Sequence, residues 1–356
     1  MSKKLEKFRQ ILKKREIPAA LITDELNIGY LCDFRFSDGF LLIDETRAML
    51  VTDFRYYEEA VSRCKGFEVV MPKDRMALIK EFLKNGVHKE IGFESDSMTV
   101  ASYHRYCDAL DTSFVPLGDV LTEMRSVKSL AELESIRRAQ AITDEAFSHV
   151  LKMMTPTMTE RDVALELSHF MKKQGGEGDS FEIICVSGAS SALPHGKCRN
   201  VQLSKGFLTM DFGCVYDGYC SDMTRTVCIG KADVEMKRLY HTVLDAQMEA
   251  LAAVKAGESC AFIDRVARQC IEDSGYPSEA FGHSLGHGVG LYIHEKPALS
   301  PNAAERRLVA GNVITVEPGI YLMGKYGCRI EDMGAVTEQG FDNFTKSTKD
   351  LIELFA

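Results

Sequence analysis

The sequence predicts two domains, an α/β N-terminal domain followed by an α+β C-terminal domain. The chain has 356 residues, more than a single domain usually contains. Strand-like and helix-like segments alternate over residues 19–110, which is typical of an α/β domain. After Gly118, a pattern of two helices followed by strands occurs twice, which favours an α+β arrangement. We therefore expect one domain over residues 1–124 and a second over residues 125–356.

The N-terminal elements follow from short apolar runs and from helical periodicity. The opening MSKKLEKFRQILKKR predicts an amphipathic helix with an apolar face formed by Leu5, Phe8, Ile11 and Leu12. Apolar runs predict strands at 19–23, 39–44, 47–53, 67–72 and 90–94. Helical patterns cover 55–64, 75–83 and 100–110. This part contains no GxGxxG motif, P-loop or cluster of potential ligands, so we interpret it as a scaffold or a lid.

The C-terminal elements begin at a capping box. Ser129 and Glu132 have the spacing that starts a helix, here a long amphipathic one. A second helix is expected over 160–173, then a strand at 181–187 and a β-hairpin. Helices at about 233–255 and 259–273 precede strands at 312–317, 328–333 and 335–338. This order predicts a domain of two halves with its sheet between helices.

Composition limits the classes of partner. The chain is 45% hydrophobic and 27% charged, with a net charge of -9 and a pI near 5.6, which argues against nucleic acid or an anionic membrane as the main partner. No run approaches the length of a membrane span, and no signal peptide is recognised. The eleven cysteines are odd in number and form no CxxC pair, which indicates reduced thiols. We expect a cytoplasmic protein.

The hairpin MDFGCVYDGYCSDMTRT (210–226) is the first indication of chemistry. If Asp217 and Gly218 form a primed turn, cross-strand partners have numbers that sum to 435, and Asp222 faces Gly213. Asp211 then lies diagonally from Asp222 on the same face. Two such anions repel each other unless one is protonated or a cation lies between them. They are either two solvent-facing aspartates or part of a metal site.

Other segments place polar residues where a core would not. HSLGHGVGLYIHE contains His283, His287 and His294 in glycine-rich chain, which predicts a loop entering a strand, and either structural or ligand histidines. Glu317 ends the apolar run VITVE before Pro-Gly, as a ligand or simply a polar strand end.

The segment RIED and an earlier loop add three more candidates. RIED would put Arg329 and Glu331 on one strand face, as an in-strand ion pair or as a ligand oriented by a guanidinium. His195 lies in a loop with a proline and alone indicates little.

Together these segments supply four carboxylates and one imidazole: Asp211, Asp222, His287, Glu317 and Glu331. Four carboxylates overcharge one cation but balance two divalent ions about 3.5–4 Å apart. Oxygen ligands with one imidazole suit Mn²⁺, Co²⁺ or Fe²⁺ better than a thiolate-rich zinc site does. We expect two divalent metal ions, with Mn²⁺ as the first choice and Co²⁺, Fe²⁺ or Zn²⁺ as alternatives.

The motifs DFGCVYDGYCSDMTRT, HSLGHGVGLYIHEKP, VEPGIY and GCRIED resemble the metal-site motifs of the pita-bread metallopeptidases. That family includes aminopeptidase P, Xaa-Pro dipeptidase (prolidase) and methionine aminopeptidase. The similarity covers about residues 125–345. Residues 1–120, with YLCDFRFSDG and VTDFRYY, resemble the creatinase-type N-terminal domain. Methionine aminopeptidases lack that domain, so the resemblance favours a proline-directed enzyme.

The resemblance also implies roles for the candidate residues. Asp211, Asp222 and Glu331 would bind or bridge the metals, and His287 and Glu317 would complete the second one. The catalytic set would comprise His195, His283, His294, Glu317 and Arg329. Within it His294 would stabilise the tetrahedral intermediate, and Glu317 would take the water's proton and pass it to the leaving nitrogen. Arg329 would orient a ligand carboxylate.

The implied activity is metal-dependent hydrolysis of the Xaa-Pro bond at peptide N-termini, by a homodimer. Many relatives have a basic residue where this chain has Ala298, so we favour an enzyme that is not restricted to dipeptides, although Lys296 or Arg329 could replace that charge. The alternatives are an inactive relative used for binding and a metal-free amidine hydrolase like creatinase. All five ligand positions are filled here, which disfavours both.

Overall fold

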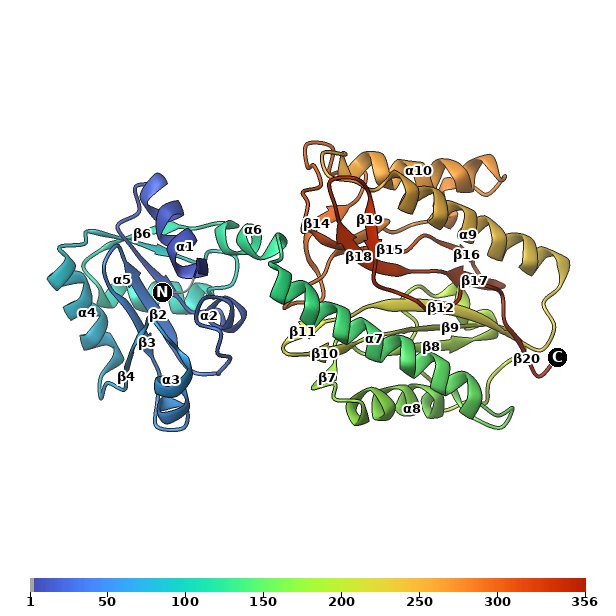
Figure 1. Cartoon of the computed structure of the whole chain (residues 1–356), viewed down its shortest axis with the longest axis horizontal. Coiled ribbons are helices and arrows are strands. Elements are labelled where there is room, and N and C mark those ends of the chain that lie inside the picture. Colours follow the sequence, from blue (N-terminus) through green and yellow to red (C-terminus); the bar gives the residue numbers. More distant parts are fainter. Residues whose placement is uncertain (1–2) are drawn as a thin grey trace. The chain divides into compact units, whose positions relative to one another are not determined.

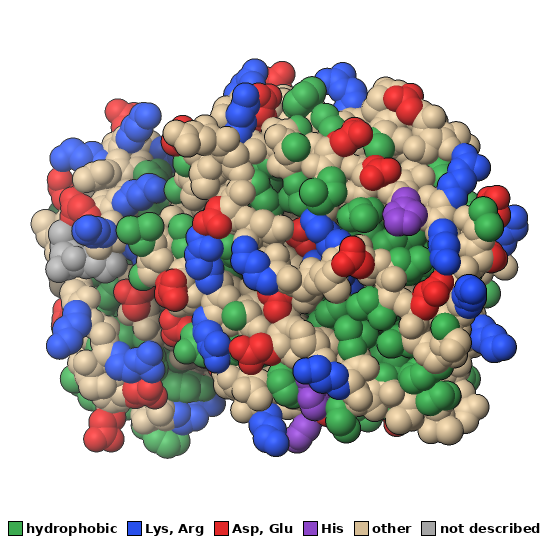
Figure 2. All heavy atoms as spheres, turned by 45° about the vertical axis from the view of Figure 1, so that its right-hand side comes forward, with side chains coloured by type: hydrophobic (Ala, Val, Ile, Leu, Met, Phe, Trp, Pro, Cys, Tyr) green, Lys and Arg blue, Asp and Glu red, His purple; other side chains and the backbone are tan. Residues whose placement is uncertain are grey.

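The computed structural model describes residues 3–356, in two compact units. The first unit ends at Arg125 and the second begins at Ser126. Each is described by itself below. Among the described residues, no helix has the length and apolar character needed to cross a membrane. On the face seen in Figure 2, acidic and basic side chains are interspersed.

The first unit is a six-stranded sheet with helices, in the order β4-β3-β2-β1-β5-β6. Only β2 is antiparallel to its neighbours. The strands are β1 (Ala19–Ile22), β2 (Phe40–Asp44), β3 (Ala48–Val51), β4 (Glu68–Val70), β5 (Glu90–Phe93) and β6 (Ser113–Pro116). The helices are α1 (Lys3–Lys14), α2 (Glu25–Cys32), α3 (Tyr57–Arg63), α4 (Arg75–Gly86), α5 (Val100–Ala109) and α6 (Val120–Ser126). Every element predicted here is confirmed, whereas α2, β6 and α6 were not predicted.

The second unit has two halves, each with two helices over strands (Figure 1). The first half has α7 (Leu130–Met153), α8 (Glu160–Lys173), β7 (Gly178–Asp179), β8 (Ile184–Ser187), β9 (Gly206–Phe212), β10 (Cys214–Tyr216), β11 (Tyr219–Cys220) and β12 (Met223–Ile229). The second half has α9 (Val234–Ala253), α10 (Cys260–Asp273), β13 (Gly286–Gly288), β14 (Glu295–Leu299), β15 (Val313–Val316), β16 (Gly319–Leu322), β17 (Tyr326–Arg329), β18 (Asp332–Val336), β19 (Phe341–Asn343) and β20 (Glu353–Leu354). Short 3₁₀ helices cover Gly188–Ala192 and Ser278–Ala280.

The sheets lie between the two helix pairs, as predicted (Figure 1). The main sheets have the orders β20-β12-β9-β8 and β14-β13-β15-β18-β19, and smaller ones the orders β11-β10-β7 and β16-β17. One apolar core packs α7 and α8 on β8, β9 and β12, and another packs α9 and α10 on the strands of the second half. The candidate site residues come from strands and loops between these helix layers.

Two local predictions for this unit are confirmed. Ser129 caps α7, and the Glu132 carboxylate accepts from the Ser129 backbone N–H in return. The hairpin pairs Val215 with Cys220, so the register sums to 435 as expected, and the same sum holds along β9 and β12. Asp217 and Gly218 both have positive φ, as a type I′ turn requires. The register fixes the face on which the two hairpin aspartates lie.

The predicted single strand over 328–333 is wrong. β17 ends at Arg329 and pairs with β16, whereas β18 begins at Asp332 and pairs with β15 in another sheet. The chain changes sheets at Ile330 and Glu331, so Arg329 and Glu331 do not share one strand face. The strand predicted at 181–187 is also shorter than expected, since β8 begins at Ile184.

Candidate metal centre

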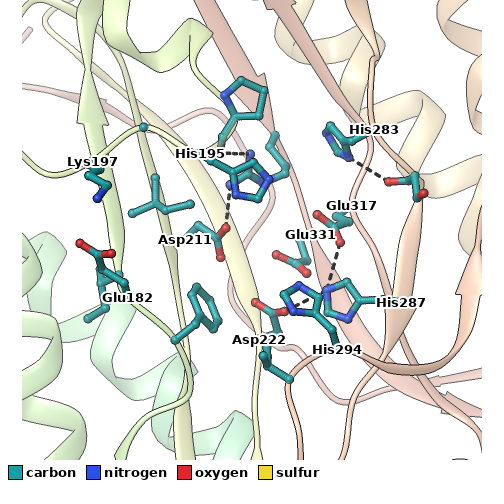
Figure 3. A pocket seen from close by; sticks show the side chains of 18 residues that line it. Glu182, His195, Lys197, Asp211, Asp222, His283, His287, His294, Glu317 and Glu331 are labelled. Atoms are coloured by element: carbon teal, nitrogen blue, oxygen red, sulfur yellow. Dashed lines mark hydrogen bonds and ion pairs between the residues drawn. The ribbon is translucent and has the colours of Figure 1, made fainter. Parts of the chain in front are cut away.

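All nine candidate site residues line one cavity of about 440 Å³ in the second unit (Figure 3). Strand β9 and the segment before β12 supply the two hairpin aspartates, and β13 supplies an imidazole. The chain after β15 supplies one glutamate, and the link between β17 and β18 supplies the other. The set comprises His195, Asp211, Asp222, His283, His287, His294, Glu317, Arg329 and Glu331. Sequence positions more than 130 residues apart therefore converge on one cavity.

Three of the five predicted ligands form a tight group. One ligand atom from each of Asp222, His287 and Glu331 lies within 4.8 Å of the other two. Glu317 joins this group through the imidazole, because its Oε1 lies 3.4 Å from His287 Nε2. The Asp222 Oδ2 lies 3.5 Å from the same nitrogen. Asp211 lines the same cavity on the side of Arg329.

The imidazole is oriented as a ligand would be. His287 Nδ1 lies 3.1 Å from the Gly288 carbonyl oxygen, so Nδ1 carries the proton and donates it there. Burial lowers the pKa of His287 to about 4, and the neighbouring His294 adds to this effect. The lone pair on Nε2 then faces the carboxylate oxygens of Asp222 and Glu317. Acceptors arranged in this way attract a cation into the space between them.

The carboxylates are crowded and poorly solvated. Burial, and then the charges of Glu331, Asp211 and Glu317, raise the pKa of Asp222 well above its usual value. Burial also raises the pKa of Glu331, and among the neighbouring charges Glu317 contributes most to this shift. Burial raises the pKa of Glu317 to about 8, although Arg329 opposes the shift. These neighbours disfavour ionised carboxylates, and divalent cations would reverse that preference.

Two buried carboxylate oxygens of the predicted ligands have no hydrogen-bond partner among the described residues. Asp211 Oδ1 and Glu331 Oε1 are shielded from solvent and accept no hydrogen bond. An unsatisfied buried acceptor is costly, and more so when it belongs to a carboxylate. Both oxygens belong to predicted metal ligands. The donor set therefore fits divalent cations: four carboxylates and an imidazole, with free oxygens inside a shared cavity.

Arg329 does not pair with Glu331, which corrects the prediction from RIED. Its Nη2 donates to Asp211 Oδ2 at 2.7 Å, and its Nε donates to Thr224 Oγ1 at 3.0 Å. The Thr224 hydroxyl in turn donates to Glu331 Oε2 at 2.7 Å. The guanidinium thus holds Asp211 directly and Glu331 through one hydroxyl. The carboxylate that Arg329 contacts directly is therefore that of Asp211 and not that of Glu331.

The remaining histidines differ in exposure. His294 is exposed beside His287, with ring centroids 4.4 Å apart, and burial and His195 lower the pKa of His294. His283 is largely shielded, and burial lowers its pKa to about 3 with a further contribution from Arg329. His195 lies exposed on the loop before Gly196. All three turn toward the cavity in Figure 3.

Tyr321 is a site residue that the sequence did not reveal. Its hydroxyl accepts from Arg329 Nη1 at 2.8 Å and lies 2.9 Å from His283 Nε2, so it links the guanidinium to an imidazole. Burial raises the pKa of Tyr321 to about 12, so the phenol keeps its proton. In the sequence GIYL, a tyrosine in an apolar strand is typical of a core. The only feature of the sequence that could have indicated a role at the site is its position three residues after Pro318, close to Glu317.

Glycines allow the strands to approach each other at the cavity. A Cβ on Gly286 would collide with the Thr315 carbonyl oxygen, and a Cβ on Gly213 with that of Ser221. The glycine-rich stretch beside His287 therefore lets β13 lie close to β15. Thr315 uses this proximity, because its hydroxyl accepts from the His287 backbone N–H and donates to Glu317 Oε1.

Comparisons with known proteins agree with this geometry. Residues 134–338 match the model of metallopeptidase family M24, and residues 4–127 match the creatinase/prolidase N-terminal domain. The chain is 35% identical to a Xaa-Pro dipeptidase of Pyrococcus horikoshii over 99% of both proteins. It superimposes on the structure of a Xaa-Pro dipeptidase from Bacillus anthracis with a TM-score of 0.95, at 39% identity and 99% coverage of both chains. It also superimposes on an X-Pro aminopeptidase from Thermotoga maritima with a TM-score of 0.90, at 37% identity, covering 96% of this chain and 99% of that one.

These matches cover both units and more than half of the chain by family model alone. The second unit has the pita-bread fold of that family, and the first has its creatinase-type N-terminal domain. The chain therefore belongs to metallopeptidase family M24.

Proposed function

We propose that this protein hydrolyses the Xaa-Pro bond at the N-terminus of peptides, with two divalent metal ions. The observation that carries the proposal is the buried acidic cluster around His287, with unpartnered oxygens on Asp211 and Glu331. Asp211, Asp222, His287, Glu317 and Glu331 would hold the ions. Bound ions of this kind act as Lewis acids that activate water and polarise a carbonyl. We favour Mn²⁺, because the donors are mostly oxygen.

The protein's own residues would handle the proton and the developing charge. Glu317 is held at Oε1 by the Thr315 hydroxyl, which leaves its other oxygen to accept the proton of the attacking water. The proline nitrogen has no hydrogen and must gain one to leave, so Glu317 would pass that proton on. His294 is exposed at the cavity and would donate to the carbonyl oxygen as negative charge develops there. His283 is held by Tyr321 and would orient the substrate with His195.

The choice of substrate rests on the relatives. Those reported above are named Xaa-Pro dipeptidase or X-Pro aminopeptidase, which supports proline at position 2 but not one peptide length. Lys296, one of the two possible substitutes for a basic residue at position 298, does not line the cavity. Arg329 is occupied by Asp211. Neither of these two residues is therefore placed to hold a substrate carboxylate, and Lys197 is the lysine that lines the cavity. We propose that peptides longer than dipeptides are accepted.

A peptide panel tests this function. With Mn²⁺ present, Ala-Pro, Ala-Pro-Ala and a longer Xaa-Pro peptide are incubated with the enzyme and analysed by mass spectrometry, with Met-Ala-Ser as the control. We expect cleavage of the Xaa-Pro peptides and none of the control. Cleavage of Ala-Pro alone would restrict the enzyme to dipeptides. Cleavage of Met-Ala-Ser would refute proline specificity, and no cleavage with metal bound would favour a binding protein or an amidine hydrolase.

We also propose a homodimer that works in the cytoplasm. The family resemblance supports the dimer, and the free cysteines of the described chain are compatible with a reducing compartment. Light scattering after gel filtration measures the mass, and a value near the 39.7 kDa of one chain would refute the dimer.

A further inference from the structure

The loop Leu193–Cys198 brings His195 and Lys197 to the cavity, yet it belongs to no helix or strand. It lies beside β8, which is the edge strand of its sheet because its other side pairs with β9. An edge strand presents backbone N–H and C=O groups that no further strand satisfies. What satisfies those groups here determines where the loop lies.

The sulfur of Cys198 occupies that open edge. The Cys185 backbone N–H donates to Cys198 Sγ at 3.1 Å, and the Cys198 thiol donates to the Ile183 carbonyl oxygen at 3.0 Å. One atom thus satisfies a backbone N–H of β8 and the carbonyl oxygen of Ile183, the residue just before β8. Burial raises the pKa of Cys198, so the thiol keeps the proton that it donates.

The chain is also anchored just before and just after Cys198. Before it, the Pro194 carbonyl oxygen accepts from Arg329 Nη1 at 3.2 Å. After it, the backbone and guanidinium of Arg199 donate to the buried Glu160 carboxylate. Gly196 lets the loop lie flat, because a Cβ there would lie 2.8 Å from Val186 Cγ1. Between these anchors the position of the loop along β8 depends on the sulfur.

We propose that Cys198 is a positioning residue for catalysis, which holds the His195 loop in place through its two hydrogen bonds to the edge of β8. His195 touches the substrate, whereas Cys198 acts only through the loop. The inference rests on the proposed function, since it concerns the same cavity. It assigns a role to a side chain that does not itself line that cavity.

The test is a double-mutant cycle between Cys198→Ala and His195→Ala, measured as kcat/KM on Ala-Pro-Ala with Mn²⁺. The alanine loses both bonds, so kcat/KM should fall about 10-fold in the wild-type background. In the His195→Ala background the same change should cost nothing further, because the group that it positions is gone. Cys198→Ser keeps a donor and an acceptor and should restore most of the activity, with metal content unchanged throughout.

The matched control is Cys185→Ala, which removes a buried thiol from the same strand but keeps its backbone N–H. It should leave kcat/KM near the wild-type value. Hydrogen exchange adds a readout without substrate: the Cys185 amide should exchange faster in Cys198→Ala than in Cys198→Ser. Equal penalties in both backgrounds, or no rescue by serine, would overturn the proposal.

A second variant covers the case in which Cys198→Ala does not fold. Gly196→Ala displaces the loop by collision with Val186 but keeps the Cys198 side chain in the protein. Its loss of kcat/KM should likewise vanish in the His195→Ala background, and an undiminished loss would refute the positioning role. A wild-type enzyme that cleaves no Xaa-Pro peptide would refute the proposed function and this inference together, whereas active wild type with uncoupled variants refutes the inference alone.

Discussion

Glu331 and Asp332 are neighbours in the chain and both are almost fully buried, yet their surroundings differ. Asp332 Oδ1 accepts from Arg225 Nη2 at 2.8 Å, and Oδ2 accepts from Lys349 Nζ at 2.8 Å and from Asn343 at 2.7 Å. Burial alone would raise its pKa, but Arg225 and Lys349 lower the pKa of Asp332 below its usual value. The protein itself completes this cluster.

Glu331 contacts no cation directly, because the Arg329 guanidinium reaches it only through the Thr224 hydroxyl. One of its oxygens accepts from Thr224 and the other accepts nothing, while burial and the charges of Glu317 and Asp211 raise its pKa. The two carboxylates therefore distinguish a structural cluster from a functional one. Where the chain supplies a cation to each buried carboxylate, the cluster stabilises the fold. Where one guanidinium, that of Arg329, faces four carboxylates, a bound metal can supply the remaining positive charge.

Removal of metal should have the largest effect. Because the acidic cluster depends on external cations, chelation should abolish peptidase activity, and Mn²⁺ or Co²⁺ should restore it. Activity on Ala-Pro-Ala is measured in samples whose metal content is determined by inductively coupled plasma mass spectrometry. Full activity in a preparation shown to be metal-free would refute the mechanism and leave the contrast between Glu331 and Asp332 without a functional meaning.

Replacing Asp332 and Glu331 each by its amide should affect stability differently. Asp332→Asn leaves Arg225 buried without its full counter-charge and should lower the free energy of unfolding by about 3–5 kcal/mol. Glu331→Gln removes a repelled charge, so it should not destabilise the metal-free protein, although it should impair metal binding. Urea denaturation of both metal-free variants measures this. Equal destabilisation would contradict the comparison.

Much of the fold was predictable because its elements have clear periodicity. The helices with one apolar face were found with nearly correct ends, as in α8 and α10, and a capping box located the start of α7. Helix α2 was missed because residues Asn27–Cys32 are all buried, so no polar face marks a helical period. The break between β17 and β18 was missed because a sequence does not show that a strand changes sheets.

The site was predictable in its residue types but not in its pairings. Carboxylates and histidines stood out because they interrupt apolar strands and glycine-rich turns. The partner of Arg329 could not be read from RIED, since Asp211 is 118 residues away and only the tertiary fold brings the two together. Tyr321 looks like a core residue in an apolar strand, and Cys198 lies in a polar loop where nothing marks it. Both are distinguished only by tertiary contacts that have no local sequence pattern.

Substitution of His294 tests which residues belong to the metal-binding cluster. It packs against His287 but is not among the tightly grouped ligand atoms, so we expect it to act on the substrate. His294→Ala should lower kcat by roughly 10²–10³-fold, the effect of losing one oxyanion donor, while metal content stays unchanged. If metal is lost together with activity, His294 is a ligand and the cluster is larger than we propose.

Arg329 is the cation that the chain itself supplies to the acidic cluster. Its substitution should have the smallest of the effects predicted here. Its guanidinium holds Asp211 and, through Thr224, Glu331, so it orients ligands without replacing a metal. Arg329→Ala should weaken metal affinity or activity by about 10–100-fold, as expected for a partner that orients a ligand. Arg329→Lys is the matched control, because it keeps the charge but cannot make all of these bonds. If lysine restores full metal affinity, the charge alone matters. If Arg329→Lys lowers metal affinity as much as Arg329→Ala does, the planar geometry of the guanidinium matters. The contrast with Asp332 then depends on geometry as well as on charge.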